Sequence, residues 1–252
     1  MTAKLALVTG GLHRVGAAIS AKLARDGYAL ALHGRGVSEP DEALADVLAQ
    51  TGVERSIFAA DLSSPKGAEG LLQDVMEICG RAPDVLVNNA SKFGQGGWDR
   101  MTPESLSEQM QVNLAAPVML AKGVVEHSKD SKPCIINILD QRVLNPPADQ
   151  TAYTLSKQAL WQATRTLAVA FGDKARVNAV APGMTLPTDD FTVGQMERLA
   201  EDMPLGVLPK PNQIADAVAY LASAEATSGQ TIFVDGGAHL TAFARDFLYM
   251  AR

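Results

Sequence analysis

Short apolar runs alternate with longer segments of helical periodicity along most of the chain. This alternation is typical of a parallel sheet whose strands are joined by helices that cover both of its faces. The predicted strands are Lys4–Val8, Ala29–His33, Arg55–Ala59, Val85–Val87, Cys134–Ile138, Arg176–Ala179 and Thr231–Val234. The segments with the clearest helical composition are Glu39–Gln50, Lys66–Cys79, Pro103–Ser128 and Ala148–Phe171. The sequence therefore predicts an α/β fold with seven strands.

Two stretches depart from this pattern, at Phe93–Trp98 and Gly183–Pro211. Each follows a predicted strand's carboxyl end, where open α/β sheets bind ligands, and long loops in compact domains are commonly functional. We expect residues 183–211 to form a substrate lid, in which Asp189, Asp190 and Phe191 are candidates for substrate contact without an assigned role. No linker or internal repeat divides the chain, so we expect one domain over residues 1–252.

The composition narrows the class of partner. The chain has a hydrophobic content of 47% and a formal net charge of −6, with no basic run to meet a nucleic-acid backbone. Cys79 and Cys134 lack the spacing of a metal site and fit two buried thiols in a reducing cytosol. Few residues precede the first apolar run, and no stretch approaches the roughly 20 apolar residues of a membrane-spanning helix. We expect a soluble, cytoplasmic protein that binds no nucleic acid, membrane or metal.

A glycine-rich turn joins the first predicted strand to a helix, with the sequence Thr9-Gly10-Gly11-Leu12-His13-Arg14-Val15-Gly16. Glycines let a backbone turn tightly and approach a pyrophosphate, and the helix N-terminus offers free N–H groups with partial positive charge. A glycine-rich turn also occurs without a ligand, but its place between a strand and a helix favours a dinucleotide site.

The second predicted strand ends in Leu32-His33-Gly34-Arg35, with no acid where an NAD-binding fold holds the ribose hydroxyls. Arg35 and Arg14 can supply charge-assisted hydrogen bonds to the 2′-phosphate of NADP, although either arginine alone also fits a solvated surface charge. We therefore predict NADP rather than NAD. Asp61, after the third strand, fits an acceptor for the adenine edge or, alternatively, a helix N-cap.

Small and amide side chains follow the fourth strand in Asn88-Asn89-Ala90-Ser91-Lys92-Phe93. Residues of these types let the chain pass close to a ribose and hold an irregular turn. Phe93 then begins the loop expected beside the nicotinamide. A position facing the substrate and a position in the core both remain open for this ring.

Tyr153 and Lys157 are four residues apart on a predicted helix, so both side chains lie on one face. An ammonium group can stabilise a phenolate, because a nearby positive charge lowers the pKa of a tyrosine. Asn113 lies in a helix expected to border the same site. It fits either a proton relay, through a water or a backbone carbonyl, or an ordinary polar position on the helix.

Taken together, these pieces resemble the short-chain dehydrogenase/reductase family from Lys4 to about Leu240. The matching pieces are Thr9-Gly10 with Gly16, Asp61, Asn88-Asn89-Ala90, Asn113, Tyr153 with Lys157, Pro182-Gly183 and Val234-Asp235-Gly236-Gly237. The resemblance implies a Rossmann-type, doubly wound sheet of seven parallel strands, with Tyr153 as the acid/base, Lys157 on the nicotinamide ribose and Asn113 in a proton relay. It implies cofactor contacts from Gly10, His13, Arg14, Val15, Gly16, His33, Arg35, Asp61, Leu62, Asn89, Ala90, Ser91, Tyr153, Lys157, Pro182 and Gly183.

Two departures from the common family pattern are more informative than the matches. Arg14 stands where the central glycine of the first turn is expected, and Asp140 stands where a serine is expected, thirteen residues before Tyr153. In both respects the chain is similar to the pteridine reductases, with the bacterial dihydromonapterin reductases as the nearest functional analogue. That likeness implies that Phe93 stacks on a pterin ring and that Ser91 lies beside cofactor and substrate. It also implies that Asp140 works with Tyr153 and Lys157 in proton delivery.

An acid at position 140 suits reduction at nitrogen better than reduction at oxygen. Ketone reduction places negative charge on an oxygen that two neutral hydroxyl groups can stabilise. Reduction of a ring C=N bond leaves a nitrogen that must be protonated, and a carboxyl group can bring that proton directly or through water. A carboxylate would also raise the pKa of a neighbouring phenol, so that the two groups titrate jointly. The alternative is that Asp140 is a structural acid paired with Arg142.

These residues predict NADPH-dependent reduction of a C=N bond in a dihydropterin, a dihydrofolate or a similar flat substrate. One alternative is a carbonyl reductase that acts on 3-oxoacyl thioesters or ketones. A second is a catalytically silent NADPH-binding sensor. The intact pair of Tyr153 and Lys157 speaks against the sensor.

The C-terminal tail, Thr241–Arg252, is apolar for an exposed terminus, with Phe243, Phe247, Leu248 and Tyr249. We expect it to dock on a neighbouring subunit. The family resemblance also implies a homo-oligomer, most commonly a tetramer.

Overall fold

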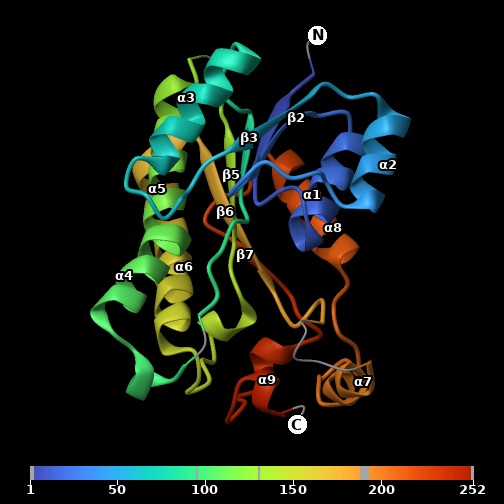
Figure 1. Cartoon of the computed structure of the whole chain (residues 1–252), viewed down its shortest axis with the longest axis vertical. Coiled ribbons are helices and arrows are strands. Elements are labelled where there is room, and N and C mark those ends of the chain that lie inside the picture. The colour runs from blue at the N-terminus through green and yellow to red at the C-terminus, as the bar shows by residue number, and fades with distance from the viewer. Residues whose placement is uncertain (1–2, 95, 130, 188–192, 251–252) are drawn as a thin grey trace.

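A sheet of seven strands lies between two layers of helices in the computed structural model, which describes residues 3–94, 96–129, 131–187 and 193–250 (Figure 1). The strands follow the order β3-β2-β1-β4-β5-β6-β7, and each neighbouring pair is parallel. Their bounds are β1 Leu5–Thr9, β2 Ala29–Gly34, β3 Arg55–Ala59, β4 Val85–Asn88, β5 Cys134–Ile138, β6 Arg176–Pro182 and β7 Thr231–Val234. The predicted Rossmann-type sheet is confirmed, and its order reverses between β1 and β4.

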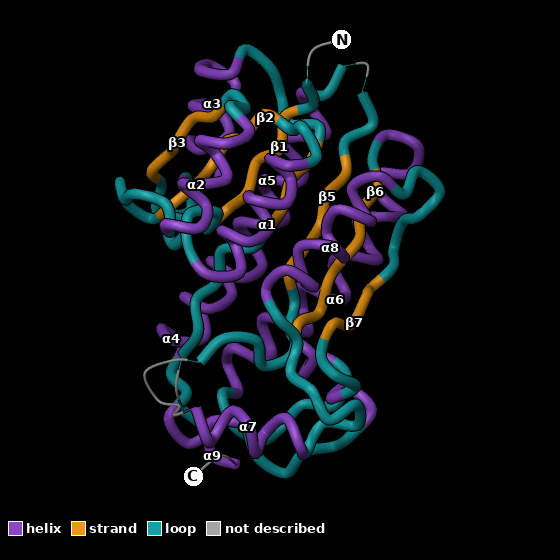
Figure 2. The backbone as a smooth tube through the Cα atoms, turned by 90° about the vertical axis from the view of Figure 1, so that its right-hand side faces the viewer, coloured by secondary structure: helices purple, strands orange, loops and turns teal. Residues whose placement is uncertain are grey.

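Helices cover both faces of the sheet (Figure 1, Figure 2). One face carries α1 Arg14–Arg25, α2 Glu42–Thr51 and α8 Pro211–Ser223, and the other carries α3 Gly67–Cys79, α5 Ala116–His127 and α6 Thr151–Phe171. Each interface is filled by its own buried apolar cluster, with Ile19 and Val218 in the first and Leu71 and Leu120 in the second. Because the central strands are covered on both faces, they read as continuous apolar runs rather than as alternating ones.

The predicted helix Pro103–Ser128 is built in three parts. They are α4 Pro103–Met110, a π-helical turn η2 at Gln111–Ala115, and α5. Pro117 has no N–H to donate to the carbonyl of Asn113, four residues earlier, as a continuous α-helix would require. The helix widens at this point, and such π-helical turns recur at functional sites. Asn113 is fully buried inside the turn.

The predicted loop Gly183–Pro211 contains a helix, α7 Val193–Glu201. Leu199 of this helix and Met203 beyond it are buried. Asp189, Asp190 and Phe191 lie outside the described residues. The lid role of residues 183–211 and the single-domain organisation stay predictions.

The C-terminal segment packs against its own chain. Phe247, which opens the short helix α9 Phe247–Met250, is buried with Leu199 and Met203, and its ring meets that of Phe243 at a centroid distance of 5.1 Å. Figure 2 shows α7 and α9 together at one end of the molecule. Phe247 is thus buried within its own chain and Phe243 packs on it, while the expected docking of the tail on a neighbouring subunit stays a prediction.

The expectations for membrane-spanning helices and for the two cysteines can be compared with the structure. Within the described ranges, no helix is both long and apolar enough to cross a bilayer. Both cysteines are free thiols, but the expectation that both are buried is correct only for Cys134, because Cys79 is partly exposed.

The glycine-rich turn packs backbone directly against backbone. Gly10 has a left-handed φ of +61°, and a Cβ atom at Gly16 would lie 1.9 Å from the carbonyl oxygen of Gly10. No side chain fits that space. Gly16 therefore allows α1 to begin directly beside the end of β1.

Replacing Gly16 with alanine should lower the free energy of unfolding by about 2 kcal/mol, because the added methyl group forces the turn away from Gly10. The matched control is Gly70→Ala, since Gly70 is also helical, in α3, and a Cβ there meets no atom within 4 Å. The control should raise the free energy of unfolding by about 0.5–1 kcal/mol through helix propensity. Urea denaturation followed by circular dichroism measures both changes, and equal effects would contradict the close packing at Gly16.

Candidate active site

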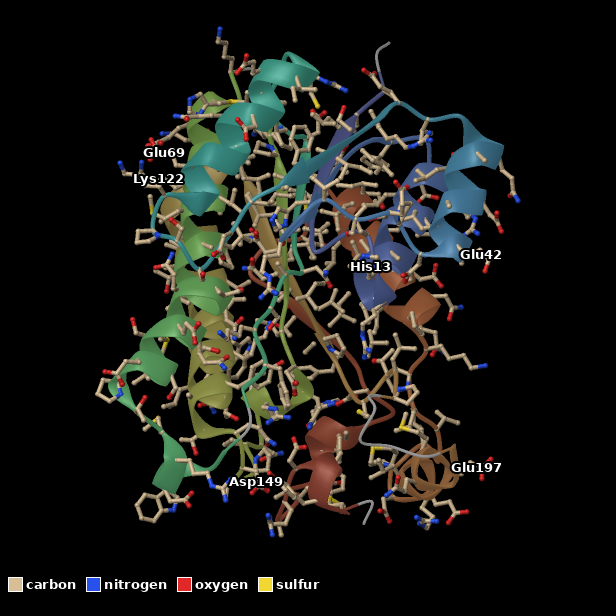
Figure 3. The ribbon with its side chains drawn as sticks, viewed as in Figure 1. His13, Glu42, Glu69, Lys122, Asp149 and Glu197 are labelled. Carbon is tan, nitrogen blue, oxygen red and sulfur yellow. The ribbon has the colours of Figure 1, made fainter. Side chains whose placement is uncertain are left out.

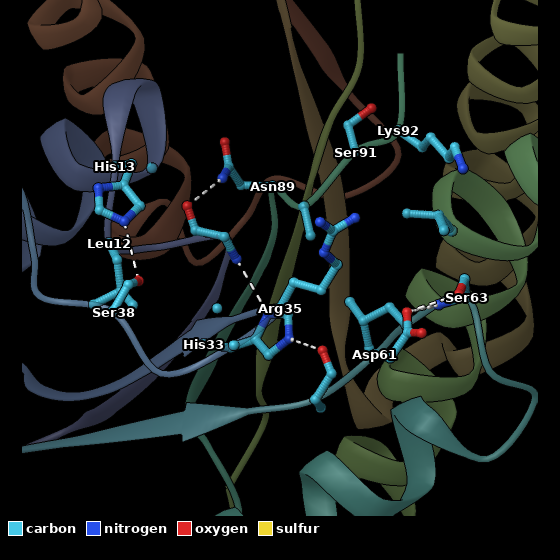
Figure 4. A pocket seen from close by; sticks show the side chains of 18 of the residues that line it. Leu12, His13, His33, Arg35, Ser38, Asp61, Ser63, Asn89, Ser91 and Lys92 are labelled. Atoms are coloured by element: carbon cyan, nitrogen blue, oxygen red, sulfur yellow. Dashed lines mark hydrogen bonds between the residues drawn. The ribbon is translucent and has the colours of Figure 1, made fainter. Parts of the chain in front are cut away.

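A cavity of about 1020 Å³ opens where β1, β2, β3 and β4 end (Figure 4). Its wall is made by the carboxyl end of β2 and by the segments that follow these four strands, joined by Glu108 and Val112. Most of the predicted cofactor contacts line it, namely Gly10, His13, Arg14, Val15, Gly16, His33, Arg35, Asp61, Leu62, Asn89, Ala90 and Ser91. Tyr153, Lys157, Pro182 and Gly183, also predicted to contact the cofactor, lie outside this wall.

His33 holds the first turn to the sheet rather than carrying charge into the cavity. The Gly10 N–H donates to its Nδ1 at 3.2 Å, and its Nε2 lies 3.0 Å from the carbonyl oxygen of Ala60. Burial lowers the pKa of His33. A neutral ring that accepts at Nδ1 and donates at Nε2 satisfies both contacts.

Asp41 closes one corner of the glycine-rich turn and was missed by the sequence analysis. Its carboxylate lies 2.7 Å from His13 Nδ1 and accepts from the Arg14 N–H at 2.7 Å. Slight burial would raise the pKa of Asp41, but the hydrogen bonds from His13 and Arg14 outweigh it and hold that pKa below its usual value. Arg14 itself has a left-handed φ of +57°, which a non-glycine residue adopts only at some cost. Asp41 gave no signal in sequence because its partners are 27 and 28 residues away.

Asp61 stands in the cavity wall and forms a local turn. Its Oδ1 accepts from the N–H and the hydroxyl of Ser63 at 2.9 and 2.7 Å. These two hydrogen bonds lower the pKa of Asp61. The N-cap of α3 is Lys66, so the alternative reading of Asp61 as the helix cap is wrong.

Asn113 anchors the loop that follows β4. Its Oδ1 accepts from the Ser91 hydroxyl at 3.1 Å and from the Lys92 N–H at 2.8 Å. Its Nδ2 donates to the carbonyl oxygen of Lys92 and to the Ser156 hydroxyl, both at 2.9 Å. The π-helical turn thus ties Ser91, on the cavity wall, to α6, which carries Tyr153.

Asp140 and Tyr153 form the core of a second cluster, at the end of β5. The Tyr153 hydroxyl donates to Asp140 Oδ2 at 3.1 Å. Asp140 Oδ1 accepts from the backbone N–H and the Nε of Arg142 at 3.0 and 3.1 Å. Lys157 Nζ donates to the carbonyl oxygen of Ile138 at 2.8 Å. The sequence offered Asp140 either a tyrosine or Arg142 as partner, and the carboxylate binds both, one on each oxygen.

Phe93 lies beside this pair and not in the core. Half of the residue is exposed, and its ring meets the Tyr153 ring edge-on at a centroid distance of 4.9 Å and an angle of 72°. Pro182 and Gly183 stand at the end of β6, the strand next to β5, where the Gly183 N–H donates to the carbonyl of Val234 at 3.0 Å.

Burial dominates the electrostatics of the cluster. Burial raises the pKa of the Tyr153 phenol well above its usual value, and the Asp140 carboxylate raises it further. Burial lowers the pKa of Lys157 to about 8, although Asp140 opposes that shift. The phenol is therefore held as a proton donor to Asp140. The side-chain amine of Lys157 is partly deprotonated at mildly basic pH.

Arg142 extends the cluster towards the C-terminal segment. Its Nη2 forms a short ion pair with Asp246, and its Nη1 approaches Gln150 Oε1 at 3.5 Å. Arg142 was visible in sequence only as a neighbour of Asp140. Asp246 is 104 residues further along and is preceded by no motif that would have identified it.

Comparisons with known proteins find relatives over nearly the whole chain. Residues 11–239 match the family model described as enoyl-(acyl carrier protein) reductase. The chain is similar to the crystal structure of the FolM alternative dihydrofolate reductase 1 from Brucella canis complexed with NADP, with 36% identity, a TM-score of 0.85, and coverage of 94% of this chain and 95% of that one.

Two curated relatives differ in their reactions. Pteridine reductase 1 of Leishmania tarentolae is 30% identical over 283 residues, covering 95% of this chain and 98% of its own length. The 3-oxoacyl-[acyl-carrier-protein] reductase FabG of Pseudomonas aeruginosa is 33% identical over 244 residues, covering 94% and 98%. Similarity of this degree is thus shared by proteins named for different substrates.

The lowered pKa of Lys157 can be measured without any substrate. In protein labelled with ¹³C-lysine, the Nζ-adjacent carbon of Lys157 should titrate with a midpoint of about 8, because burial disfavours its charged form. The signal is assigned by its loss in Lys157→Arg. A midpoint near the ordinary lysine value would contradict the buried, carbonyl-bound ammonium group.

Proposed function

The chain belongs to the short-chain dehydrogenase/reductase family, and we propose that it is an NADPH-dependent reductase of a C=N bond in a pteridine-like substrate of the dihydropterin or dihydrofolate type. That the chain is an oxidoreductase of this family follows from the match over residues 11–239. The proposal of a pteridine-like substrate is argued from the side chains of the site.

The cavity at the ends of β1 to β4 has the donor set for NADP. His13, Arg14 and Arg35 lie in its wall, and β2 ends without an acidic residue that would repel a 2′-phosphate. The close contact of Gly16 with Gly10 leaves the N-terminus of α1 open to a pyrophosphate. The bound cofactor supplies the hydride. Val15, Leu62, Asn89, Ala90, Ser91, Pro182 and Gly183 are proposed as its further contacts.

The observation that carries the proposal is the hydrogen bond from the Tyr153 hydroxyl to Asp140 Oδ2. In a ketone reductase the corresponding serine would leave the tyrosine hydroxyl free to donate to the substrate oxygen. Here the phenol proton is directed to a carboxylate, and the pair can pass a proton to a nitrogen directly or through a water. Asp140 and Tyr153 are the proposed catalytic pair.

Lys157 and Asn113 are the proposed supporting residues of this pair. Lys157 is buried against the carbonyl of Ile138, with its Nζ 5.8 Å from the Tyr153 ring centroid. We propose that its ammonium group binds the nicotinamide ribose and holds positive charge near the phenol. Asn113, bonded to Ser91 and Ser156, is proposed to order the proton relay.

Phe93 is proposed as the platform for the flat ring of the substrate, with Ser91 beside it. Its ring is half-exposed, and one edge is fixed by Tyr153. An exposed aromatic face next to a proton-donating pair suits a planar heterocycle better than a flexible acyl chain. The resemblance to an alternative dihydrofolate reductase and to a pteridine reductase supports the same substrate class.

The second candidate function is carbonyl reduction of a 3-oxoacyl thioester or a ketone. It is favoured by the 33% identity to the 3-oxoacyl-[acyl-carrier-protein] reductase of Pseudomonas aeruginosa. The carboxylate at position 140 speaks against it. A homotetramer and a cytoplasmic location also stay predictions.

Asp140→Ala should lower kcat for dihydropterin reduction by about 10²–10⁴-fold, since it removes the proton-delivering carboxylate. NADPH binding, followed by the change in cofactor fluorescence, should stay within about twofold of the wild-type value, because Asp140 lies outside the cavity wall. Asp173→Asn is the matched control: it changes an exposed carboxylate in the short helix η4 Gly172–Lys174, far from the site in the sheet. Full activity of Asp140→Ala would refute the catalytic role.

A substrate screen separates the two candidate functions. With NADPH, the wild-type chain should turn over dihydropterins or dihydrofolate and leave 3-oxoacyl thioesters unreduced. Asp140→Ser should lose the pterin activity, because a serine cannot carry the proton that the nitrogen needs. If the wild-type chain reduces ketones and Asp140→Ser simply does so faster, carbonyl reduction is the function.

A further inference from the structure

Arg142 is a buried cation between two carboxylates that come from distant parts of the chain. The arginine and Asp246 are 5% and 6% exposed. One side of the guanidinium binds Asp140 Oδ1 through Nε, and the other binds Asp246 Oδ2 through Nη2. Burial alone would lower the pKa of Arg142, but Asp140 and Asp246 outweigh it and raise that pKa. The arginine is therefore permanently charged, and its removal would leave two carboxylates without their shared partner.

The arginine also determines which oxygen of Asp140 is free for chemistry. Because its N–H and Nε both bind Oδ1, the Oδ2 atom is left to the Tyr153 hydroxyl. The guanidinium carbon lies 5.0 Å from the Tyr153 ring centroid and 5.9 Å from that of Phe93. One side chain thus contacts the proton donor, the proton acceptor and the proposed stacking ring.

The C-terminal segment holds this arginine from behind. The Asp246 N–H donates to Asp149 Oδ2 at 2.9 Å, and Arg245 pairs with the same carboxylate, at the end of the molecule where Figure 3 labels Asp149. The next residue, Phe247, is buried in one cluster with Leu199 of α7. The chain is therefore held in place both at Arg245 and at Phe247, on either side of Asp246.

Gln150 closes the remaining side of the arginine at some backbone cost. It is fully buried, has a left-handed φ of +49°, and approaches Arg142 Nη1 with its Oε1. A non-glycine residue in this region is uncommon and persists where the surroundings require it.

We propose that Arg142 is a positioning residue of the active site and that Asp246 of the C-terminal segment holds it there, so that docking of this segment orients the Asp140 carboxylate towards Tyr153. The inference rests on the proposed role of Asp140 in proton delivery and is independent of which substrate is reduced. An ion pair with a purely structural role would affect stability but would not shift the pH dependence of turnover in opposite directions when its two ends are removed.

The charges around Asp140 determine the sign of these shifts. Arg142 faces it from the turn η3 Gln141–Val143, Tyr153 and Lys157 face it from α6, and Asp246 lies behind Arg142. Removing the negative charge of Asp246 favours the deprotonated form of the remaining groups. Removing the positive charge of Arg142 favours their protonated form.

Three variants test the proposal, with kcat, KM and the pH midpoint of NADPH-dependent turnover as readouts. Asp246→Asn should lower kcat about tenfold, with the KM for NADPH unchanged, because a small misplacement of a catalytic group slows the reaction strongly. Its pH midpoint should fall by about half a unit, and that of Arg142→Gln should rise by about as much. Arg142→Lys should restore the wild-type midpoint while kcat stays low, since a lysine keeps the charge but not the paired contacts. Should Arg142→Gln fail to fold, the other two variants carry the test.

Glu126→Gln is the matched control. Like Asp246→Asn it replaces one carboxylate of an ion pair by its amide, but the pair of Glu126 with Lys122 is half-exposed on α5, away from Arg142, and its loss should leave kcat and the pH midpoint unchanged. Equal midpoints in Asp246→Asn, Arg142→Gln and the wild-type chain would overturn the proposal.

Hydrogen exchange separates this proposal from the proposed function, because it needs no substrate. The Arg142 amide, bonded to Asp140, should exchange at least about tenfold faster in Asp246→Asn than in Glu126→Gln. If the wild-type chain reduces no pterin but this difference is seen, the proposed function fails, while the positioning of Arg142 by Asp246 stands. Equal exchange in the two variants would overturn that positioning whatever the substrate.

Discussion

All strands of the sheet run in one direction, and the arrangement of the site depends on this constraint. Parallel strands end at a common edge, so the residues that follow them meet in space although they are far apart in sequence. The glycine-rich turn follows β1, Arg35 follows β2, Asn89 follows β4 and Asp140 follows β5. The helices that return the chain cover both faces with apolar contacts, which leaves that edge as the place where polar groups accumulate.

Burial then determines what the polar groups can do. A carboxylate, a phenol, an ammonium group and a guanidinium group share a small volume from which water is largely excluded, so each charge must be balanced by another. Asp140 binds a proton donor with one oxygen and a cation with the other, while Lys157 is held by a backbone carbonyl. A serine at position 140 would supply neither the charge nor the second contact. Arg142 binds Asp140 on one side of its guanidinium group and Asp246 on the other.

The fold alone does not identify the reaction. Chains with about 30% identity over nearly their whole lengths include a pteridine reductase and a 3-oxoacyl-[acyl-carrier-protein] reductase, which share the sheet and differ in named substrate. The proposed substrate class rests on a small set of side chains at the ends of β4 and β5, with Phe93 half-exposed beside the Tyr153–Asp140 pair. The cofactor cavity, in contrast, is lined by residues that follow four strands.

Local pattern was enough to predict the seven strands, the glycine-rich turn and the Tyr153–Lys157 pair, because the residues involved are neighbours in sequence and hydrophobic periodicity reports burial directly. The same reasoning missed Asp41 and Asp246, left Asp140 with two possible partners, and did not find the packing of the tail on its own chain. Each of these depends on contacts between residues that are far apart in the chain, such as Arg142 with Asp246 or Phe247 with Leu199. Such contacts follow from how helices and loops pack around the sheet, and no short-range pattern records them. Residue types and their order thus specify the sheet and the candidate chemistry, while only tertiary packing decides which charges neutralise one another and which oxygen of Asp140 faces Tyr153.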